Sequence, residues 1–331
     1  MTTMIHRRVF CQALAGTGVA VSAIGAAQTP AKVYRLANLE IGRPDDPPGP
    51  PDMRADPFVI ELARLGLVEG VNLVTDFRSA RGNPALLDTL AAELVATRPD
   101  LIYTGSGYSG ALALKKATTT IPVVFVAVGE PVAAGLVASL ARPGGNLTGG
   151  TIPDELEVKR VQILFEILGT SASVMLLTSP LGKRRRAGFV DALAARHARL
   201  QFMEVNKGED LAPAFEQMVR QRVDGVAVVK TYLTATYDRE ITALAVKHRL
   251  PAIADGDCAD RGMMMSYNVD YFELERRAAN YVYRILKGAQ PGELPIEQPT
   301  KFEFVINMKA AKAMGVRIPL PVLTRATRVI D

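Results

Sequence analysis

The sequence predicts an α/β fold in which two Rossmann-like lobes, each built on a parallel sheet, are joined by a hinge. Short apolar, β-branched runs alternate with helical segments, which is the pattern of right-handed βαβ units. This alternation runs through residues 33–150 and starts again, with a different sequence, in residues 151–331. The chain has 331 residues, which is long enough for two hydrophobic cores.

The composition is that of a globular protein and excludes several classes of function. The formal charge of +5, which falls to +3 without residues 1–27, is too small to indicate a nucleic-acid partner. The three histidines are scattered, so we expect no metal site and no cofactor. Of the two cysteines, Cys11 and Cys258, only Cys258 remains if the N-terminal segment is cleaved, which excludes an intrachain disulfide.

Residues 1–27 have the features of an export signal. Arg7 and Arg8 form a short cationic region, residues 9–24 are mostly small and apolar, and residues 25–27 offer small side chains for cleavage. The Arg7-Arg8 pair also fits the core of a twin-arginine signal, so the Sec and twin-arginine routes both stay open. We therefore expect an exported, periplasmic protein, with no later segment long and apolar enough to span a bilayer.

In the first lobe, strands and helices are expected to alternate. The expected strands are 33–39, 71–77, 101–104 and 123–128, and the expected helices are 57–67, 84–97 and 109–118. The run Val123–Val128 is apolar throughout, as in a parallel strand buried on both faces. A further helix is predicted to begin at Pro131 and to end near Arg142, and residues 143–151 are the expected first hinge strand.

A glycine-rich turn, Gly105–Gly110, follows the third expected strand and matches the pattern G-x-G-x-x-G. One interpretation is a dinucleotide site, with Glu130 as the acid that follows it. However, the motif follows the third strand instead of the first, and Glu130 lies further on than the usual spacing of about 20 residues. We favour a turn whose N–H groups and Ser106, Tyr108 and Ser109 side chains bind a small ligand. An ordinary tight turn is the third possibility.

In the second lobe the same alternation is expected. The expected strands are 174–178, 201–205, 225–229, 251–254, 263–267 and 302–306, and the expected helices are 154–168, 184–199, 211–221, 236–248, 271–287 and 308–314. The chain is expected to cross back to the first lobe around residues 268–300, which contain a long helix and a proline-containing connection.

Polar residues near strand ends of the second lobe are candidates for ligand contact, because ligands bind at the carboxyl ends of parallel strands. Ser179, Tyr232, Asp255 and Tyr267 hold such positions. Asp255 would pair with a ligand ammonium, although aspartate is also common in turns that bind nothing. The basic run 183–186 opposes the dipole of the helix predicted to begin there, and a solvated charge run is favoured over an anion site.

The sequence contains no recognisable catalytic constellation. It has no Gly-x-Ser-x-Gly elbow, no Walker loop and no paired histidines, and Cys258 has no histidine near it in sequence. We therefore expect a binding protein and not an enzyme.

Several segments follow one another in an order that is specific to a known family. The segment 118–149 reads TTTIPVVFVAVGEPVAAGLVASLARPGGNLTG, and the segments 265–267, 276–289 and 294–303 follow it. Over about residues 33–331 the chain resembles the substrate-binding proteins of ABC transporters, in the tryptophan-binding-type family. The resemblance implies a periplasmic-binding-protein fold that traps a ligand between two hinged lobes. It also implies docking on an inner-membrane permease, and ligands such as tryptophan or related amino acids.

The chain differs from the family pattern at several places where a ligand would bind, and its segment 180–186 is shorter and more basic than the family pattern. It has Gly129-Glu130-Pro131 where the family has Gly-Asp-Pro, Tyr108-Ser109 where Thr-Pro is common, and Tyr267-Asn268 where Tyr-Gly is usual. We therefore expect an amino-acid-like or small organic ligand, without choosing one.

The expected ligand contacts come from both lobes and are Asn38, Ser106, Tyr108, Ser109, Glu130, Ser179, Tyr232, Asp255 and Tyr267. We expect an extracytoplasmic solute-binding protein of an ABC importer, acting as a monomer with a small-molecule ligand and an ABC permease as its partners. Two alternatives stay open, namely an NAD-dependent enzyme that uses Gly105–Gly110 and a ligand-sensing accessory protein for a membrane receptor.

Overall fold

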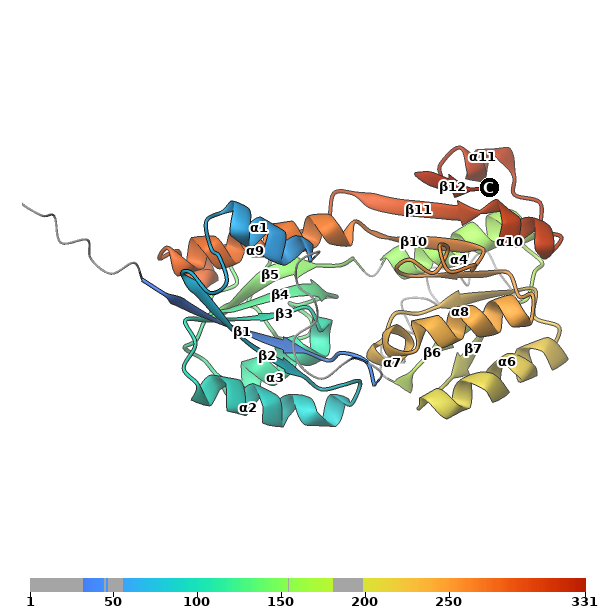
Figure 1. Cartoon of the computed structure of the whole chain (residues 1–331). Coiled ribbons are helices and arrows are strands. Elements are labelled where there is room, and N and C mark those ends of the chain that lie inside the picture. Colours follow the sequence, from blue (N-terminus) through green and yellow to red (C-terminus); the bar gives the residue numbers. More distant parts are fainter. Residues whose placement is uncertain (1–31, 45, 47–55, 154, 181–198) are drawn as a thin grey trace, which may run out of the picture. The chain divides into compact units, whose positions relative to one another are not determined.

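The structure is a computed structural model, and it describes residues 32–44, 46, 56–153, 155–180 and 199–331. The predicted export signal, the basic run 183–186 and the helix predicted over 184–199 fall outside these residues, apart from residue 199. Val33–Asp331 form one compact unit that contains two lobes, each with its own sheet (Figure 1). No helix in the described ranges is long and apolar enough to cross a bilayer.

The first lobe is built on a five-stranded parallel sheet with the order β2-β1-β3-β4-β5. Its strands are β1 (Tyr34–Glu40), β2 (Leu73–Ser79), β3 (Leu101–Thr104), β4 (Val123–Val128) and β5 (Leu147–Thr151). The strand predicted over residues 123–128 is confirmed as β4, with nearly every residue buried. Since β2 and β3 lie on opposite sides of β1, the topological switch point of this sheet lies between β1 and β3.

Helices cover both faces of the first sheet (Figure 1). On one face lie α2 (Leu87–Ala96), which follows the 3-10 turn η2 (Pro84–Leu86), and α3 (Gly107–Ala117). On the other face lie α1 (Pro57–Arg64) and α9 (Tyr271–Leu286). The start of α1 is set locally, because the Asp56 carboxylate accepts a 2.8 Å hydrogen bond from the Phe58 N–H and Pro57 occupies the first turn.

The second lobe is built on a seven-stranded sheet with the order β12-β11-β10-β9-β8-β6-β7. Its strands are β6 (Val174–Thr178), β7 (Leu200–Glu204), β8 (Gly225–Val228), β9 (Ala252–Ala254), β10 (Met265–Val269), β11 (Phe302–Asn307) and β12 (Arg328–Ile330). The pairing of β10 with β11 is antiparallel and the other pairings are parallel. The mixed α/β class and the two lobes with parallel sheets agree with the sequence prediction.

Two apolar clusters fill the faces of the second sheet. The helices among the described residues of this lobe are α4 (Glu155–Leu168), the 3-10 turn η4 (Gly208–Asp210), α6 (Leu211–Arg220), α7 (Tyr232–Thr236), α8 (Asp238–Lys247), α10 (Met308–Ala313) and α11 (Leu320–Leu323). The residues of α4, α10 and α11 pack in one cluster, and those of α6, α7 and α8 pack in the other.

The helix α9 follows β10 of the second sheet in sequence but packs on the first sheet. Its apolar stripe, which includes Leu274, Ala278 and Tyr281, lies in the same cluster as α1, β3 and β4. The chain then passes through the 3-10 turn η5 (Pro291–Glu293), where the Thr148 hydroxyl of β5 donates to the Leu294 carbonyl at 2.8 Å, before it returns to β11. Thus α9 places side chains of the later sequence on one face of the first lobe's sheet.

The helix predicted between Pro131 and Arg142 is absent, and turns occupy residues 129–140 instead. Gly135, with φ of 68°, has left-handed backbone that interrupts a helix after its first turn, and Glu130, with φ of 45°, is left-handed directly before Pro131. The Leu136 N–H and the Val137 N–H both bond to the Pro131 carbonyl, which closes a compact loop. The apolar residues of this segment therefore pack without helical periodicity, and the sequence prediction was wrong there.

Candidate functional site

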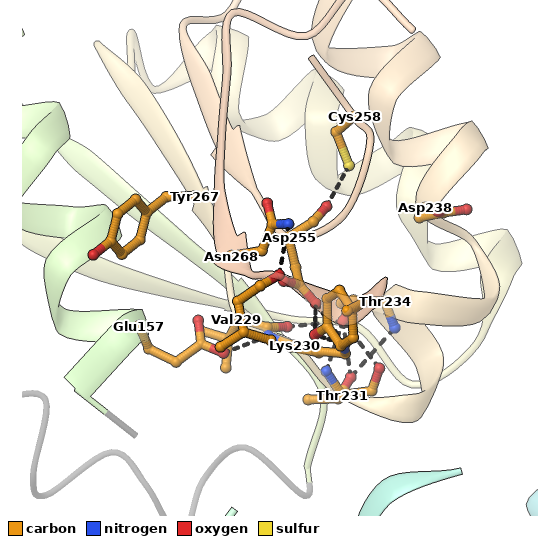
Figure 2. A network of polar contacts seen from close by, with 12 residues as sticks. Glu157, Val229, Lys230, Thr231, Thr234, Asp238, Asp255, Cys258, Tyr267 and Asn268 are labelled. Carbon is orange, nitrogen blue, oxygen red and sulfur yellow. Dashed lines mark hydrogen bonds and ion pairs between the residues drawn. The ribbon is translucent and has the colours of Figure 1, made fainter. Parts of the chain in front are cut away.

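A network of charged side chains lies where strands β8 and β9 of the second sheet end (Figure 2). Lys230 follows β8 and Asp255 follows β9, so parallel pairing of these strands brings the two together. Helix α4 contributes Glu157 and Arg160, and Tyr271 is the first residue of α9.

Asp255 is the centre of this network. Its Oδ1 atom accepts a hydrogen bond from Arg160 Nη2 at 2.9 Å, and its Oδ2 atom lies 2.6 Å from Lys230 Nζ. The Tyr271 hydroxyl donates to the same Oδ2 atom at 2.7 Å and accepts a hydrogen bond from Lys230 Nζ. Arg160 Nη1 also binds Glu157 Oε2 at 2.7 Å. The four charged groups, two acids and two bases, therefore form one connected and balanced set.

Local structure holds Lys230 in place. Its N–H donates to Glu157 Oε1 at 3.0 Å. The next residue, Thr231, caps α7, and Thr234 in the first turn of that helix donates its hydroxyl to the Val229 carbonyl at 2.8 Å (Figure 2). Hydrogen bonds thus fix the backbone on both sides of Lys230, and this fixes the position from which its side chain extends.

The electrostatics of the network favour full ionisation. Burial by itself would raise the pKa of Asp255, but the charges of Lys230 and Arg160 outweigh it and lower that pKa below its ordinary value. Burial opposes the charge of Lys230, yet Asp255 raises the Lys230 pKa above its ordinary value. The Arg160 side chain is only 2% exposed, whereas Lys230 is 33% exposed and is the most exposed of the four. Lys230 is therefore the charged member that solvent, or a solute, can reach.

Other predicted residues of the second lobe have different environments. Ser179 follows β6 and is fully buried, and its hydroxyl has no hydrogen-bond partner among the described residues. Tyr232 begins α7 and packs against the adjacent apolar cluster. Tyr267 lies inside β10 and not after it, and its ring stacks on Phe302 with centroids 6.2 Å apart. The prediction that Tyr267 ends a strand was therefore wrong.

A second group of polar residues lies at the switch point of the first sheet. Glu40 is the last residue of β1, and Gly105 and Ser106 follow β3. The Gly105 N–H donates to Glu40 Oε1 at 2.8 Å, and the Ser106 hydroxyl donates to Glu40 Oε2 at 3.0 Å. The glycine-rich turn thus already binds a carboxylate of its own chain. Because the Gly105 N–H and the Ser106 hydroxyl are used in this way, they are not available to a pyrophosphate, and the geometry does not favour a dinucleotide in the turn.

Tyr103 and Glu275 extend this first-lobe cluster, which we define as Glu40, Tyr103, Ser106 and Glu275. The Tyr103 ring stacks on Phe58 with centroids 4.1 Å apart, and its hydroxyl donates to Glu275 Oε2 on α9. Burial raises the pKa of Glu40 to about 7 and the pKa of Glu275 to about 8. The two carboxyl groups therefore hold protons in a pH range where ordinary surface acids are ionised.

The remaining predicted residues of the first lobe are spread around this cluster. Asn38 lies inside β1, is 4% exposed, and its Oδ1 atom has no hydrogen-bond partner among the described residues. Tyr108 and Ser109 lie in the first turn of α3, where the Tyr108 ring packs against the apolar cluster on the opposite face of the sheet. Glu130 is exposed on the turn after β4. Among these predicted residues, the structure brings Ser106 into the cluster and Asn38 beside it.

Several residues of the two groups were not predicted as ligand contacts from the sequence. Glu40 and Lys230 lie at strand ends, so the rule that selected Asp255 could have selected them as well. Arg160 and Glu275 lie inside helices with ordinary charged surfaces, and no local pattern distinguishes them. Their membership of the two groups follows only from the hydrogen bonds that Arg160 forms with Asp255 and that Glu275 forms with Tyr103.

The described residues do not suggest metal or thiol chemistry. They contain no group of three or more His, Cys, Asp or Glu side chains that could bind a metal ion. Cys258 is buried, its Sγ atom lies 2.8 Å from the Asp255 carbonyl oxygen, and burial raises the pKa of its thiol to about 11. A thiol with such a pKa is a poor nucleophile near neutral pH.

Two α/β lobes with polar groups at the carboxyl ends of their strands form an architecture that suits the binding of a small solute. The family model for ABC transporter substrate-binding proteins matches residues 55–330, and the chain belongs to this family. The family consists of solute-binding proteins and not of enzymes.

Known relatives agree with this assignment. A tyrosine-binding protein of Clostridioides difficile is 27% identical over 267 residues, which cover 78% of this chain and 76% of the relative. A conserved domain protein from Vibrio cholerae has a crystal structure with a TM-score of 0.80 and 28% identity, and the match covers 90% of this chain and 100% of that one. A Streptococcus pneumoniae domain crystallised with L-Trp has the same fold, with a TM-score of 0.80, 23% identity and the same coverage.

Proposed function

We propose that this protein is the extracytoplasmic solute-binding component of an ABC importer, and that its ligand is an aromatic amino acid or a related carboxylate. Membership of the substrate-binding family and the similarity to a tyrosine-binding protein support the class of ligand. In this proposal residues 1–27 direct export to the periplasm, and the loaded protein, a monomer, delivers its ligand to a membrane permease.

The proposal rests on one observation, namely that the ammonium group of Lys230 is partly exposed at the end of β8. A lysine ammonium has three N–H donors, and the contacts to Asp255 and Tyr271 use two of them. The third donor, on a side chain that is 33% exposed at the end of β8, is available for an anionic group of a solute. A ligand carboxylate that accepts this hydrogen bond would gain a charge-assisted contact in a partly desolvated position.

The mechanism in this proposal is closure of the two lobes around the ligand. A solute that contacts polar groups of both lobes stabilises the closed state over the open one by its differential affinity for the two. The contacts that we propose are the predicted residues Asn38, Ser106, Tyr108, Ser109, Glu130, Ser179, Tyr232, Asp255 and Tyr267, together with Lys230. Asp255 then acts mainly through Lys230 and Arg160, which already bind its carboxylate.

Isothermal titration of the purified protein with L-tyrosine, L-tryptophan and aromatic carboxylates tests this function. A bound solute at 100 times its dissociation constant should also stabilise the fold by about 2.7 kcal/mol in thermal unfolding. Replacing Lys230→Met should weaken carboxylate binding about tenfold or more, because a charge-assisted hydrogen bond is lost. Lys247→Met, on the exposed last turn of α8, is the matched control and should bind as the wild type does. Unchanged affinity in Lys230→Met would contradict the assigned role.

A further inference from the structure

We propose that the first lobe contains a separate subsite for the amine of the ligand, formed by Glu40, Glu275 and Asn38 around the Tyr103 hydroxyl. This inference rests on the proposed function, because it assumes that the protein binds a solute at its strand ends. The subsite would bind the cationic amine of the ligand in the first lobe, whereas Lys230 in the second lobe would bind its anionic group.

The position of the subsite follows from the topology. Glu40 and the Gly105-Ser106 turn flank the switch point between β1 and β3, where α/β sheets bind ligands. Asn38 pairs in register with Tyr103 across β1 and β3, so their side chains emerge on the same face of the sheet. Helix α9 covers that face and brings Glu275 to the Tyr103 hydroxyl.

The free valences in this group are hydrogen-bond acceptors. Tyr103 gives its single hydroxyl proton to Glu275, which leaves only its oxygen lone pairs. Each oxygen of Glu40 accepts one hydrogen bond, from the Gly105 N–H or from the Ser106 hydroxyl, and has a further lone pair. The Oδ1 atom of Asn38, on a side chain that is 4% exposed, accepts no bond from the described residues. A buried acceptor without a donor is costly, so the group is complementary to a ligand that supplies several N–H donors.

The acceptors gather beside Gly105. A Cβ atom at Gly105 would lie 3.2 Å from the Tyr103 Oη atom and 3.2 and 3.3 Å from the two oxygens of Glu40. A side chain at this position would crowd these oxygens, so glycine allows them to lie together. Three oxygen atoms gathered in this way suit a cationic group that donates several hydrogen bonds.

The charges around the subsite also favour a cation. Asp56 acts on both Glu40 and Glu275 and raises their pKa values, as Glu40 does for Glu275. Glu61 of α1 is by contrast already paired, with Arg64 and Asn280. A cationic amine would replace protons at the two raised carboxyl groups, so its binding near pH 7 should release protons.

Calorimetry with a matched pair of ligands tests the subsite. L-tyrosine carries the amine, and 3-(4-hydroxyphenyl)propanoate is the same molecule without it. The wild type should bind L-tyrosine at least tenfold more tightly, and titration in buffers of different ionisation enthalpy should show proton release at pH 7. Glu40→Gln should weaken L-tyrosine binding about tenfold and leave the amine-free ligand unchanged. Glu275→Gln should also weaken L-tyrosine binding and leave the amine-free ligand unchanged. Agreement between the two variants would exclude a local folding defect in one of them as the cause.

The control and the outcomes separate this inference from the proposed function. Glu216→Gln, on the exposed face of α6, removes an acid that pairs only at the surface, and it should change neither affinity. The subsite is overturned if both Glu variants bind L-tyrosine within twofold of the wild type, or lose the two ligands equally. It is also overturned, while the proposed function stands, if the wild type binds the amine-free ligand as tightly as L-tyrosine. If neither ligand binds, both proposals are wrong.

Discussion

The second-lobe network and the first-lobe cluster both lie at the carboxyl ends of parallel strands but have opposite electrostatics. Arg160 and Lys230 neutralise the buried Asp255, whereas the hydrogen bonds that Glu40 and Glu275 accept come from Gly105, Ser106 and Tyr103 and not from a basic side chain. In the second lobe, cations outweigh burial and lower the pKa of the carboxyl group. In the first lobe, burial dominates and raises the pKa values. Carboxyl ends of parallel strands thus carry a fixed charge network in one lobe and a protonatable acceptor group in the other.

The difference shows what each lobe contributes before a ligand arrives. The second-lobe network satisfies its own charges and exposes only one donor, so it is preorganised for an anion. The first-lobe cluster keeps acceptors without donors and holds protons instead of an internal cation. A solute with one anionic and one cationic group would complement both.

The largest expected effect comes from breaking the second-lobe network. Arg160→Met leaves Glu157 and Asp255 buried with one cation between them, so the free energy of unfolding should fall by about 3–5 kcal/mol. Urea unfolding at pH 7 measures this loss. Arg220→Met removes an exposed ion pair with Glu216 and should change stability by less than about 0.5 kcal/mol. Equal effects in the two variants would mean that the buried network does not hold the lobe together.

The pH dependence of stability should separate the two regions. Glu40 and Glu275 have folded-state pKa values of about 7 and about 8, above the ordinary value of 4.5, so the folded state holds protons that the unfolded state has lost. Their contribution is fully present below about pH 4.5 and is lost as the pH rises towards 8. After solvent screening, the decline should be on the order of 1–2 kcal/mol.

The second lobe should respond in the opposite sense. Because the pKa of Asp255 is lowered below 3.8, its stabilisation is present above that pH and is lost on acidification below it. Chemical unfolding between pH 5 and pH 8 therefore isolates the first-lobe decline. The double variant Glu40→Gln, Glu275→Gln should show a flatter profile in this range than the wild type. An identical slope in the wild type and the double variant would show that these acids do not hold the extra protons.

The smallest of these effects should come from filling the space at the switch point. Gly105→Ala places a methyl group 3.2 Å from the Tyr103 hydroxyl and close to Glu40, so we expect a loss of about 1 kcal/mol in stability and weaker L-tyrosine binding. Gly145→Ala is the matched control, because no atom lies within 4 Å of a Cβ at that position. Thermal unfolding and calorimetry measure both changes. If Gly105→Ala binds L-tyrosine as tightly as the wild type does, the amine of the ligand does not bind beside Gly105.

The elements that the sequence predicted correctly depend on local patterns. The apolar run of β4 has few alternatives to a strand buried on both faces. The stripe of α9 repeats at helical spacing, and Asp56-Pro57 is a strong start for α1. The prediction of a helix after Pro131 failed because a favourable first turn does not ensure a second, and left-handed backbone at Gly135 interrupts the helix.

The sequence by itself determined the family, the alternation of strands and helices, and the rule that polar residues at strand ends are candidates for the site. Only the tertiary structure decided which charges meet. Arg160 lies 95 residues from Asp255, and Tyr103 lies 172 residues from Glu275. Periodicity and turn residues record how a segment is buried, and this information is local. The pairing of charges depends on distance in space and on the loss of solvent around them, which chain segments acquire only when the fold brings them together.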